Sequence, residues 1–182
     1  HCLSVEICSA PNSFASKALV DAAGVGVLAA SGEIDGVVRR MPMVVQIDKE
    51  LYPTLSLEVI RALTGDPSYQ MKVGLNGIES VRVPQFETIQ TDSNARVWIK
   101  YNKEFDRRLI YHMDDIENKV VILTISAEGL ATNVPTPYGL KNIAEVQAAM
   151  ISTLVNGDSL TRLDYADFVE ILTLTLIGLL FI

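Results

Sequence analysis

Short hydrophobic segments separated by turn residues recur along the chain and predict a set of β-strands. Residues 37–47 are rich in valine and are interrupted only by Pro42, which is typical of an edge strand or a bulge. An Asn-Gly pair separates residues 70–75 from residues 78–83, and this pair favours the two-residue turn of a β-hairpin. Further strands are predicted at residues 3–7, 25–29 and 95–101.

Two segments have the hydrophobic spacing of amphipathic helices. The first begins after Thr54, a residue type that caps helix N-termini, and ends at Gly65. The second ends at Gly157 and has one apolar face, which is formed by Ile143, Val146, Met150 and Leu154. An alanine-rich stretch, residues 12–24, predicts another helix.

Residues 119–126, with the sequence KVVILTIS, are a mostly apolar run bounded by turn residues. Such a run is typical of a central strand that is buried on both faces, so we expect it to form the core strand. Strands mixed with helices, including hairpins, predict an α/β domain that has a mixed β-sheet with flanking helices.

The C-terminal residues 171–182 read ILTLTLIGLLFI and contain no charge. This run is shorter than the ~20 apolar residues that span a bilayer, yet it is too uniformly apolar for a surface helix. It is therefore either a buried core element or a truncated membrane helix, and we favour the membrane helix. Asp164, Asp167 and Glu170 precede it without a lysine, which places the preceding domain outside the cytoplasm under the positive-inside rule. Because the chain opens with His1, we expect its natural start to lie upstream.

Composition excludes several classes of protein. The chain of 182 residues has a net charge of −7 and is 49% hydrophobic, which argues against a nucleic-acid partner and against disorder. Two cysteines, Cys2 and Cys8, are too few for a disulfide framework and lack the paired spacing of a zinc site. Length and composition thus indicate a single folded acidic domain.

The usual signatures of catalysis and cofactor binding are incomplete. Residues 24–29 match the letters of a dinucleotide-binding motif, but the predicted order of strand and helix around them is reversed. Ser126 follows the predicted core strand without the flanking glycines of a nucleophile elbow. His112, Asp114 and Asp115 are too few to complete a metal site. We therefore predict no catalytic residue, no cofactor and no metal.

A distributed pattern runs through most of the chain. Residues 31–43 read SGEIDGVVRRMPM and contain a D-G-x-x-R-x-x-P motif, which is formed by Asp35, Gly36, Arg39 and Pro42. Residues 51–65 (LYPTLSLEVIRALTG) follow, and then come residues 89–101 (IQTDSNARVWIKY), with Asp92, Arg96 and Trp98 in place. Residues 119–139 continue it with Ala127, Gly129, Leu130, Thr136, Pro137 and Gly139, and residues 145–174 complete it.

In this order the stretches resemble the type-two CHASE domain, an extracellular sensor of bacterial cyclases and kinases. Three features depart from the family pattern: Thr124 replaces a strand-end glycine, the segment between Tyr101 and Lys119 is short, and the usual N-terminal strands are absent. The departures at Thr124 and between Tyr101 and Lys119 argue against an inherited ligand crevice. The missing strands imply an incomplete domain with an exposed sheet edge.

The resemblance implies a division of the chain and a function. Residues 1–163 would be a partial extracytoplasmic sensor domain, and residues 164–182 would begin a transmembrane helix in a bacterial cell membrane. The chain itself would not be an enzyme. It would sense an unknown small-molecule or protein signal, form a homodimer and act on a cytoplasmic output, for which a class III adenylate or guanylate cyclase is the first expectation.

A ligand site, if the domain has one, is expected in the loops at the carboxyl end of the predicted core strand. This reasoning nominates Ser126, Glu128 and Thr136, with Arg39 or Arg40 as partners of an anion. Turn formation and loop rigidity explain most of these residues without a ligand. The alternatives for the whole chain are a soluble α/β enzyme and a solute-binding domain.

Overall fold

The structure is a computed structural model, and it describes residues 24–75, 77–109, 116–127, 131–160 and 166–180. The predicted strand at residues 3–7, most of the predicted helix at residues 12–24, both cysteines, His112 and Glu128 lie outside the described residues.

The predicted mixture of strands and helices is confirmed, but the described strands form four small antiparallel sheets in place of the predicted mixed sheet. The prediction failed because pairing joins segments that are far apart in the sequence, and short apolar runs do not specify their partners. Parallel contacts occur only as isolated bridges in the described part of the chain, at Val27 with Thr54 and at Ile78 with Asn94.

The sheets pair as follows. The first joins β1 (Arg40–Pro42) to β7 (Arg96–Trp98), and the second joins β2 (Val44–Ile47) to β3 (Glu50–Pro53). The third is β4 (Gln70–Gly74), β5 (Gly77–Arg82) and β6 (Thr88–Gln90), and the fourth is β8 (Asn133–Thr136) with β9 (Gly139–Asn142). The predicted hairpin around the Asn-Gly pair is confirmed, and residues 37–47 are interrupted as predicted, although the interruption falls at Met43, directly after Pro42.

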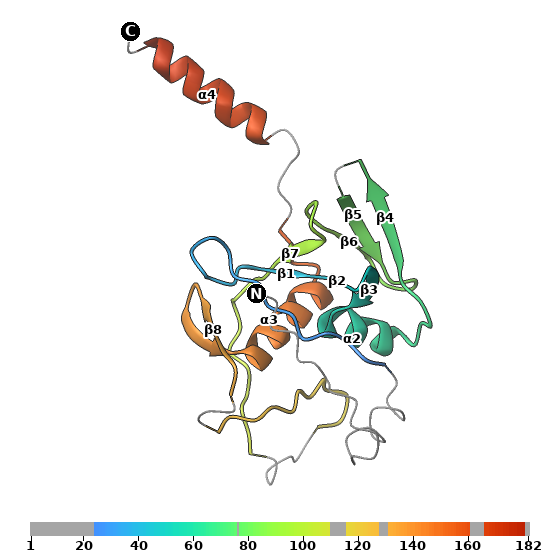
Figure 1. The fold of residues 1–182 in the computed structure, drawn as a ribbon. Helices are drawn as coiled ribbons and strands as arrows, with labels where there is room; N and C mark the ends of the chain where they lie inside the picture. Colours follow the sequence, from blue (N-terminus) through green and yellow to red (C-terminus); the bar gives the residue numbers. More distant parts are fainter. Residues whose placement is uncertain (1–23, 76, 110–115, 128–130, 161–165, 181–182) are drawn as a thin grey trace.

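Two helices pack against each other beside these sheets (Figure 1). The α2 helix spans Leu55–Thr64 and ends at Gly65, whose φ of 69° is the left-handed conformation that glycine adopts without strain. The α3 helix spans Ile143–Val155 and buries the predicted apolar face. Their core with β1, β5 and β7 contains Met41, Met43, Leu57, Ile60, Val81, Val83, Val97, Val146 and Met150.

Thr54 precedes α2 as predicted, but its side chain does not cap the helix. Its hydroxyl donates instead to the carbonyl oxygen of Met43, 3.0 Å away, and its backbone N–H donates to the same oxygen. Thr54 is fully buried, so this bond satisfies a polar group that would be costly to leave without a partner. The residue therefore fastens the start of α2 to the segment between β1 and β2.

The predicted core strand at residues 119–126 is wrong in this structure. These residues form no strand, and Leu123 and Ile125 are 70% and 62% exposed. A strand requires a neighbour that completes its backbone hydrogen bonds, and the described residues provide none for this run. Its apolar composition alone was insufficient, because a short apolar run is ambiguous until its partners are known. The predicted strand at residues 25–29 is likewise reduced to one bridge, at Val27.

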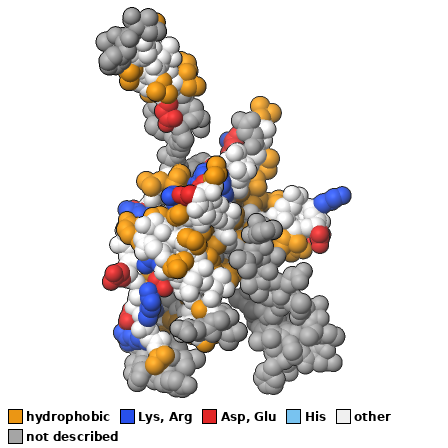
Figure 2. Space-filling view, turned by 60° about the vertical axis from the view of Figure 1, so that its left-hand side comes forward, with side chains coloured by type: hydrophobic (Ala, Val, Ile, Leu, Met, Phe, Trp, Pro, Cys, Tyr) orange, Lys and Arg blue, Asp and Glu red, His pale blue; other side chains and the backbone are white. Residues whose placement is uncertain are grey.

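The C-terminal run forms α4 (Ala166–Leu180), whose described side chains from Phe168 to Leu179 are exposed. Figure 1 shows this helix projecting away from the other elements, and Figure 2 shows its hydrophobic surface. Apolar side chains therefore face outward along its length, and it contributes nothing to the buried core. No helix in the described part of the chain combines the length and hydropathy needed to cross a membrane.

A buried polar pair joins α2 to α3 and gives a test of this packing. The Ser56 hydroxyl donates to Oε1 of Gln147 at 2.5 Å, and both residues are completely buried. We expect Ser56→Ala to lower the free energy of unfolding by about 1–3 kcal/mol, because it leaves the buried amide oxygen without that donor. Chemical denaturation measures the change. The exposed Ser68→Ala is the control, and equal effects of the two variants would contradict the assignment.

Candidate functional site

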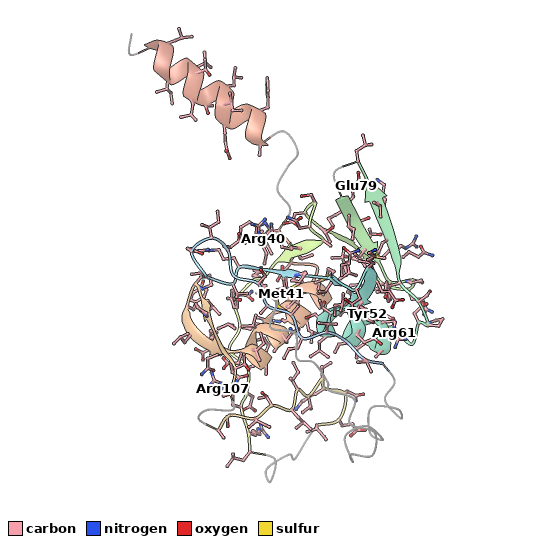
Figure 3. The ribbon with its side chains drawn as sticks, viewed as in Figure 1. Arg40, Met41, Tyr52, Arg61, Glu79 and Arg107 are labelled. Carbon is pink, nitrogen blue, oxygen red and sulfur yellow. The ribbon has the colours of Figure 1, made fainter. Side chains whose placement is uncertain are left out.

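A cluster of charged side chains surrounds Arg40 on β1 (Figure 3). Its guanidinium donates two hydrogen bonds to the Glu33 carboxylate, each 2.6 Å long, and a third to Oδ2 of Asp92 at 2.9 Å. The guanidinium carbon also lies 4.9 Å from the centre of the Trp98 ring, within the range of a cation–π contact. Arg40 therefore binds two carboxylates and one aromatic ring at once.

Strand pairing and a tight turn place these partners. Arg40 lies opposite Trp98 in the antiparallel register of β1 and β7. Asp92 occupies the turn before β7, where its Oδ1 accepts hydrogen bonds from the backbone N–H groups of Asn94 and Arg96. Its Oδ2 also accepts from Nε of Arg96 at 2.9 Å. An aspartate that bonds the backbone ahead of it is a common way to fix a turn, so the carboxylate is already oriented for Arg40.

A second ion pair lies on the loop that leads into β1. Arg39 forms a two-pronged contact with Asp35, with bonds of 3.0 and 2.8 Å. Asp35 also accepts from the backbone N–H of Val37, and Gly36 has a φ of 78°, which suits a glycine turn. A shallow cavity of about 420 Å³ opens here and is lined by Glu33, Ile34, Asp35, Arg39 and Trp98.

The charges in this cluster balance. The carboxylates of Glu33, Asp35 and Asp92 face the guanidiniums of Arg39, Arg40 and Arg96. The hydrogen bonds from Arg40 lower the pKa of Glu33, and those from Arg39 lower the pKa of Asp35 to about 2. The carboxylates of Glu33 and Asp35 are therefore ionised at neutral pH. An anionic ligand would bind by exchanging partners within the cluster.

A larger cavity of about 670 Å³ lies between the segment after β7 and the β9–α3 junction. Tyr101 and Tyr138 meet there with ring centres 6.3 Å apart. Glu145 accepts a hydrogen bond from Arg107 at 2.8 Å and faces the Lys141 ammonium at 3.6 Å. The Tyr101 hydroxyl donates to the carbonyl oxygen of Val38, and burial raises the pKa of this tyrosine. This cavity combines aromatic and charged walls.

The structure separates the five residues that the sequence nominated. Arg39 and Arg40 belong to the charged cluster. Ser126 is exposed on the run that was expected to be a strand. Thr136 is buried at the β8–β9 turn, where its hydroxyl donates to the carbonyl oxygen of Gly139. The structure therefore brings Arg39 and Arg40 to one place but neither Ser126 nor Thr136, and Glu128 lies outside the described residues.

Sequence reasoning from loop position missed Glu33, Tyr101 and Tyr138. The D-G-x-x-R-x-x-P motif lies beside Glu33, and Asp92 and Trp98 belong to the same distributed pattern. The family resemblance therefore included the neighbours of Glu33 in the cluster, although it did not identify Glu33 itself. Within the part of the chain that the structure describes, no three potential ligands lie close enough to hold a metal ion.

The family model of the CHASE2 domain matches residues 5–180. The chain belongs to the CHASE2 domain family. No curated protein and no solved structure matches it.

CHASE2 domains are extracellular sensory domains of signalling receptors, and the match gives this chain a sensory, non-catalytic role. The resemblance found in the sequence is therefore confirmed at the level of the family. The matched range includes both the charged cluster around Arg40 and the α4 helix.

The lowered pKa values give the CHASE2 domain a defined response to acid. A carboxylate whose folded-state pKa lies below its ordinary value stabilises the fold fully above that ordinary value, which is 4.5 for Glu33 and 3.8 for Asp35. We therefore expect the free energy of unfolding to fall as the pH is lowered through 4.5 toward about 2. Fluorescence of Trp98, the single tryptophan, followed during denaturation at several pH values, measures this slope.

The variants Glu33→Gln and Asp35→Asn each remove one of these titrating groups. Both are expected to make the loss of stability with acid shallower than in the unchanged domain. Slopes equal to that of the unchanged domain would contradict the role of the two ion pairs.

Proposed function

We propose that this CHASE2 domain senses a signal outside a bacterial cell and passes it to the cytoplasm through a membrane helix that begins in α4. The match over residues 5–180 carries the sensory part of the proposal. The exposed, uncharged surface of α4 beyond Glu170 supports the membrane part, because such a helix is costly in water and favourable in lipid.

The proposed contacts for the signal are Arg39 and Arg40. Their partners are carboxylates, so a signal with an acidic group can replace one of them without leaving a cation unpaired. Ser126, Glu128 and Thr136 remain proposed secondary contacts. Of these, Thr136 would have to exchange its bond to Gly139.

A connected series of contacts leads from this cluster toward α4. Strand β7 contains Arg96 and Trp98 and continues to Lys100, whose backbone N–H donates to the hydroxyl of Thr153 near the end of α3. The Lys100 ammonium lies 3.0 Å from the carboxylate of Asp158, in the segment that precedes α4. A shift of β7 therefore moves groups on both sides of the α3 terminus. If the domain exchanges between two arrangements of β7 and the end of α3, a signal that binds one of them more tightly would raise the population of that arrangement.

We further propose that the domain acts as a homodimer and that its output is a class III nucleotide cyclase. Both parts rest on the family resemblance. A dimer suits such an output, since two symmetric sensor domains can bias the relative position of two membrane helices.

The coupling route can be tested in the full-length receptor. Sequencing the gene on both sides of the region that encodes this chain identifies the output domain, and cyclic nucleotide formation is then measured in membranes. We expect Asp158→Asn to change basal output by about two- to fivefold, because a partly exposed ion pair contributes up to about 1 kcal/mol. Lys100→Ala should change basal output by a similar factor, because it removes the other partner of the same ion pair.

Lys103→Ala, at an exposed lysine in the next segment, is the matched control and should leave output unchanged. Equal output in all four proteins would contradict the route through Lys100. A gene without a cyclase domain would contradict the proposed output and leave the sensory assignment in place.

Membrane attachment through α4 has a separate test. The chain is mixed with vesicles of phosphatidylethanolamine and phosphatidylglycerol, and the bound fraction is measured by flotation. We expect binding to be lost in the double variant Leu174→Arg, Ile177→Arg, because each arginine costs about 2.5–3.5 kcal/mol at the centre of a membrane helix. The control carries the same charges on the exposed body positions Leu63 and Leu140 and should still bind. Equal binding of both double variants would contradict membrane attachment through α4.

A further inference from the structure

The hairpin of β4 and β5 has an unusual tip for a segment in contact with water. Leu75 is 105% exposed and Val73 is 68% exposed. The sequence from Val73 to Ile78, VGLNGI, contains no charged residue. By contrast, the turn of the β2–β3 hairpin consists of Asp48 and Lys49, and Glu50 follows at the start of β3. Hairpin turns in water are ordinarily polar, so the apolar tip of β4–β5 requires an explanation.

The charges nearest to the tip neutralise each other. The Lys72 ammonium lies 2.7 Å from the carboxylate of Glu79, on the neighbouring strand. An element that carries no net charge can approach hydrocarbon at a lower electrostatic cost than one with an unpaired charge. The strand ladder also continues to the pair Gly74–Gly77, which satisfies backbone groups close to the end of the hairpin.

The tip lies at the same end of the molecule as α4. In Figure 1 the β4–β5 hairpin and α4 both lie above the body, the hairpin at the right of the view and α4 at the left. Glu79, labelled in Figure 3, marks the hairpin at this end. A membrane that receives α4 would therefore also face the tip.

The hairpin is tied firmly to the charged cluster. The Thr91 hydroxyl donates to the carbonyl oxygen of Ile78, and the Thr91 backbone N–H donates to that of Glu79. The next residue, Asp92, binds Arg40 and Arg96. Gly77 packs so closely on this turn that a Cβ there would overlap the carbonyl oxygen of Ser93. The position of the tip is thus fixed relative to the cluster.

From these observations we infer that the β4–β5 tip inserts Val73 and Leu75 into the lipid surface beside α4, as a second membrane contact of the domain. This inference rests on the proposed membrane attachment of α4. Apolar side chains of interfacial elements enter the boundary between headgroups and acyl chains to a depth of about 5–10 Å. The contact would fix the height of the Asp92 turn above the membrane.

The test uses the whole chain with Cys2 and Cys8 replaced by serine and a single new cysteine labelled with an environment-sensitive fluorophore. Three proteins are compared, Leu75→Cys at the tip, Leu174→Cys in α4 and Ile34→Cys in the loop before β1. Ile34 is the control because it is as fully exposed as Leu75. Each protein is mixed with phosphatidylcholine and phosphatidylglycerol vesicles, without and with brominated phosphatidylcholine as a quencher within the bilayer.

We expect the label at position 75 to shift to shorter emission wavelengths and to be quenched by the brominated lipid, while the label at position 34 does neither. Behaviour of position 75 equal to that of position 34 would overturn the inference. A wavelength shift at 75 without quenching would also overturn it, because the tip would then contact protein, such as a second copy of the chain.

The label at position 174 reports separately on α4. Quenching at 174 but not at 75 would overturn the inference and leave the proposed function in place. Quenching at 75 but not at 174 would contradict membrane attachment through α4, and it would also overturn the inference, because the tip would then not be a second contact beside an inserted helix. Quenching at neither position would overturn both.

Discussion

The antiparallel pairing of β1 with β7 brings together segments that are far apart in the sequence, and its register determines both faces of the domain. Met41 lies opposite Val97, and both are buried in the core. One position earlier, Arg40 lies opposite Trp98 and faces the charged cluster. Because side chains alternate along a strand, a slip of one residue would place the arginine in the core and the methionine in water. Core and cluster therefore depend on the same hydrogen bonds.

This shared dependence explains how a surface event can reach the interior. Under the proposed function, exchange of a carboxylate on Arg40 would act on β1, which is hydrogen-bonded to β7 and packed on the core side chains beneath it. Beyond β7, Lys100 contacts both Thr153 and Asp158 at the end of α3. The individual ion pairs are weak at these exposures, so the packed strand and helix are the elements that transmit a displacement.

Local signals in the sequence predicted the parts of the fold that depend on local physics. Gly65 ends α2, and the apolar face of α3 is buried as its spacing predicts. Non-local pairing was not predictable: the run at residues 119–126 has the composition of a core strand but no partner among the described residues. In the site, Arg39 was identified by its place in the D-G-x-x-R-x-x-P motif, and Arg40 was nominated beside it as a partner of an anion. The role of Glu33 was missed, because nothing local connects a loop carboxylate to a strand arginine seven residues later.

A sensor joined to a membrane through one helix alone can rotate about the connecting segment, and such rotation would dissipate a displacement before it reached the bilayer. A second contact at the β4–β5 tip, as inferred above, would restrict that rotation, since a body held at two separated points can turn only about the line that joins them. Thr91 bonds the hairpin on one side, while Asp92 bonds the cluster on the other. A change of partners at Arg40 would then act on the body against a fixed hairpin, so that the end of α3, with Asp158, moves relative to the membrane surface.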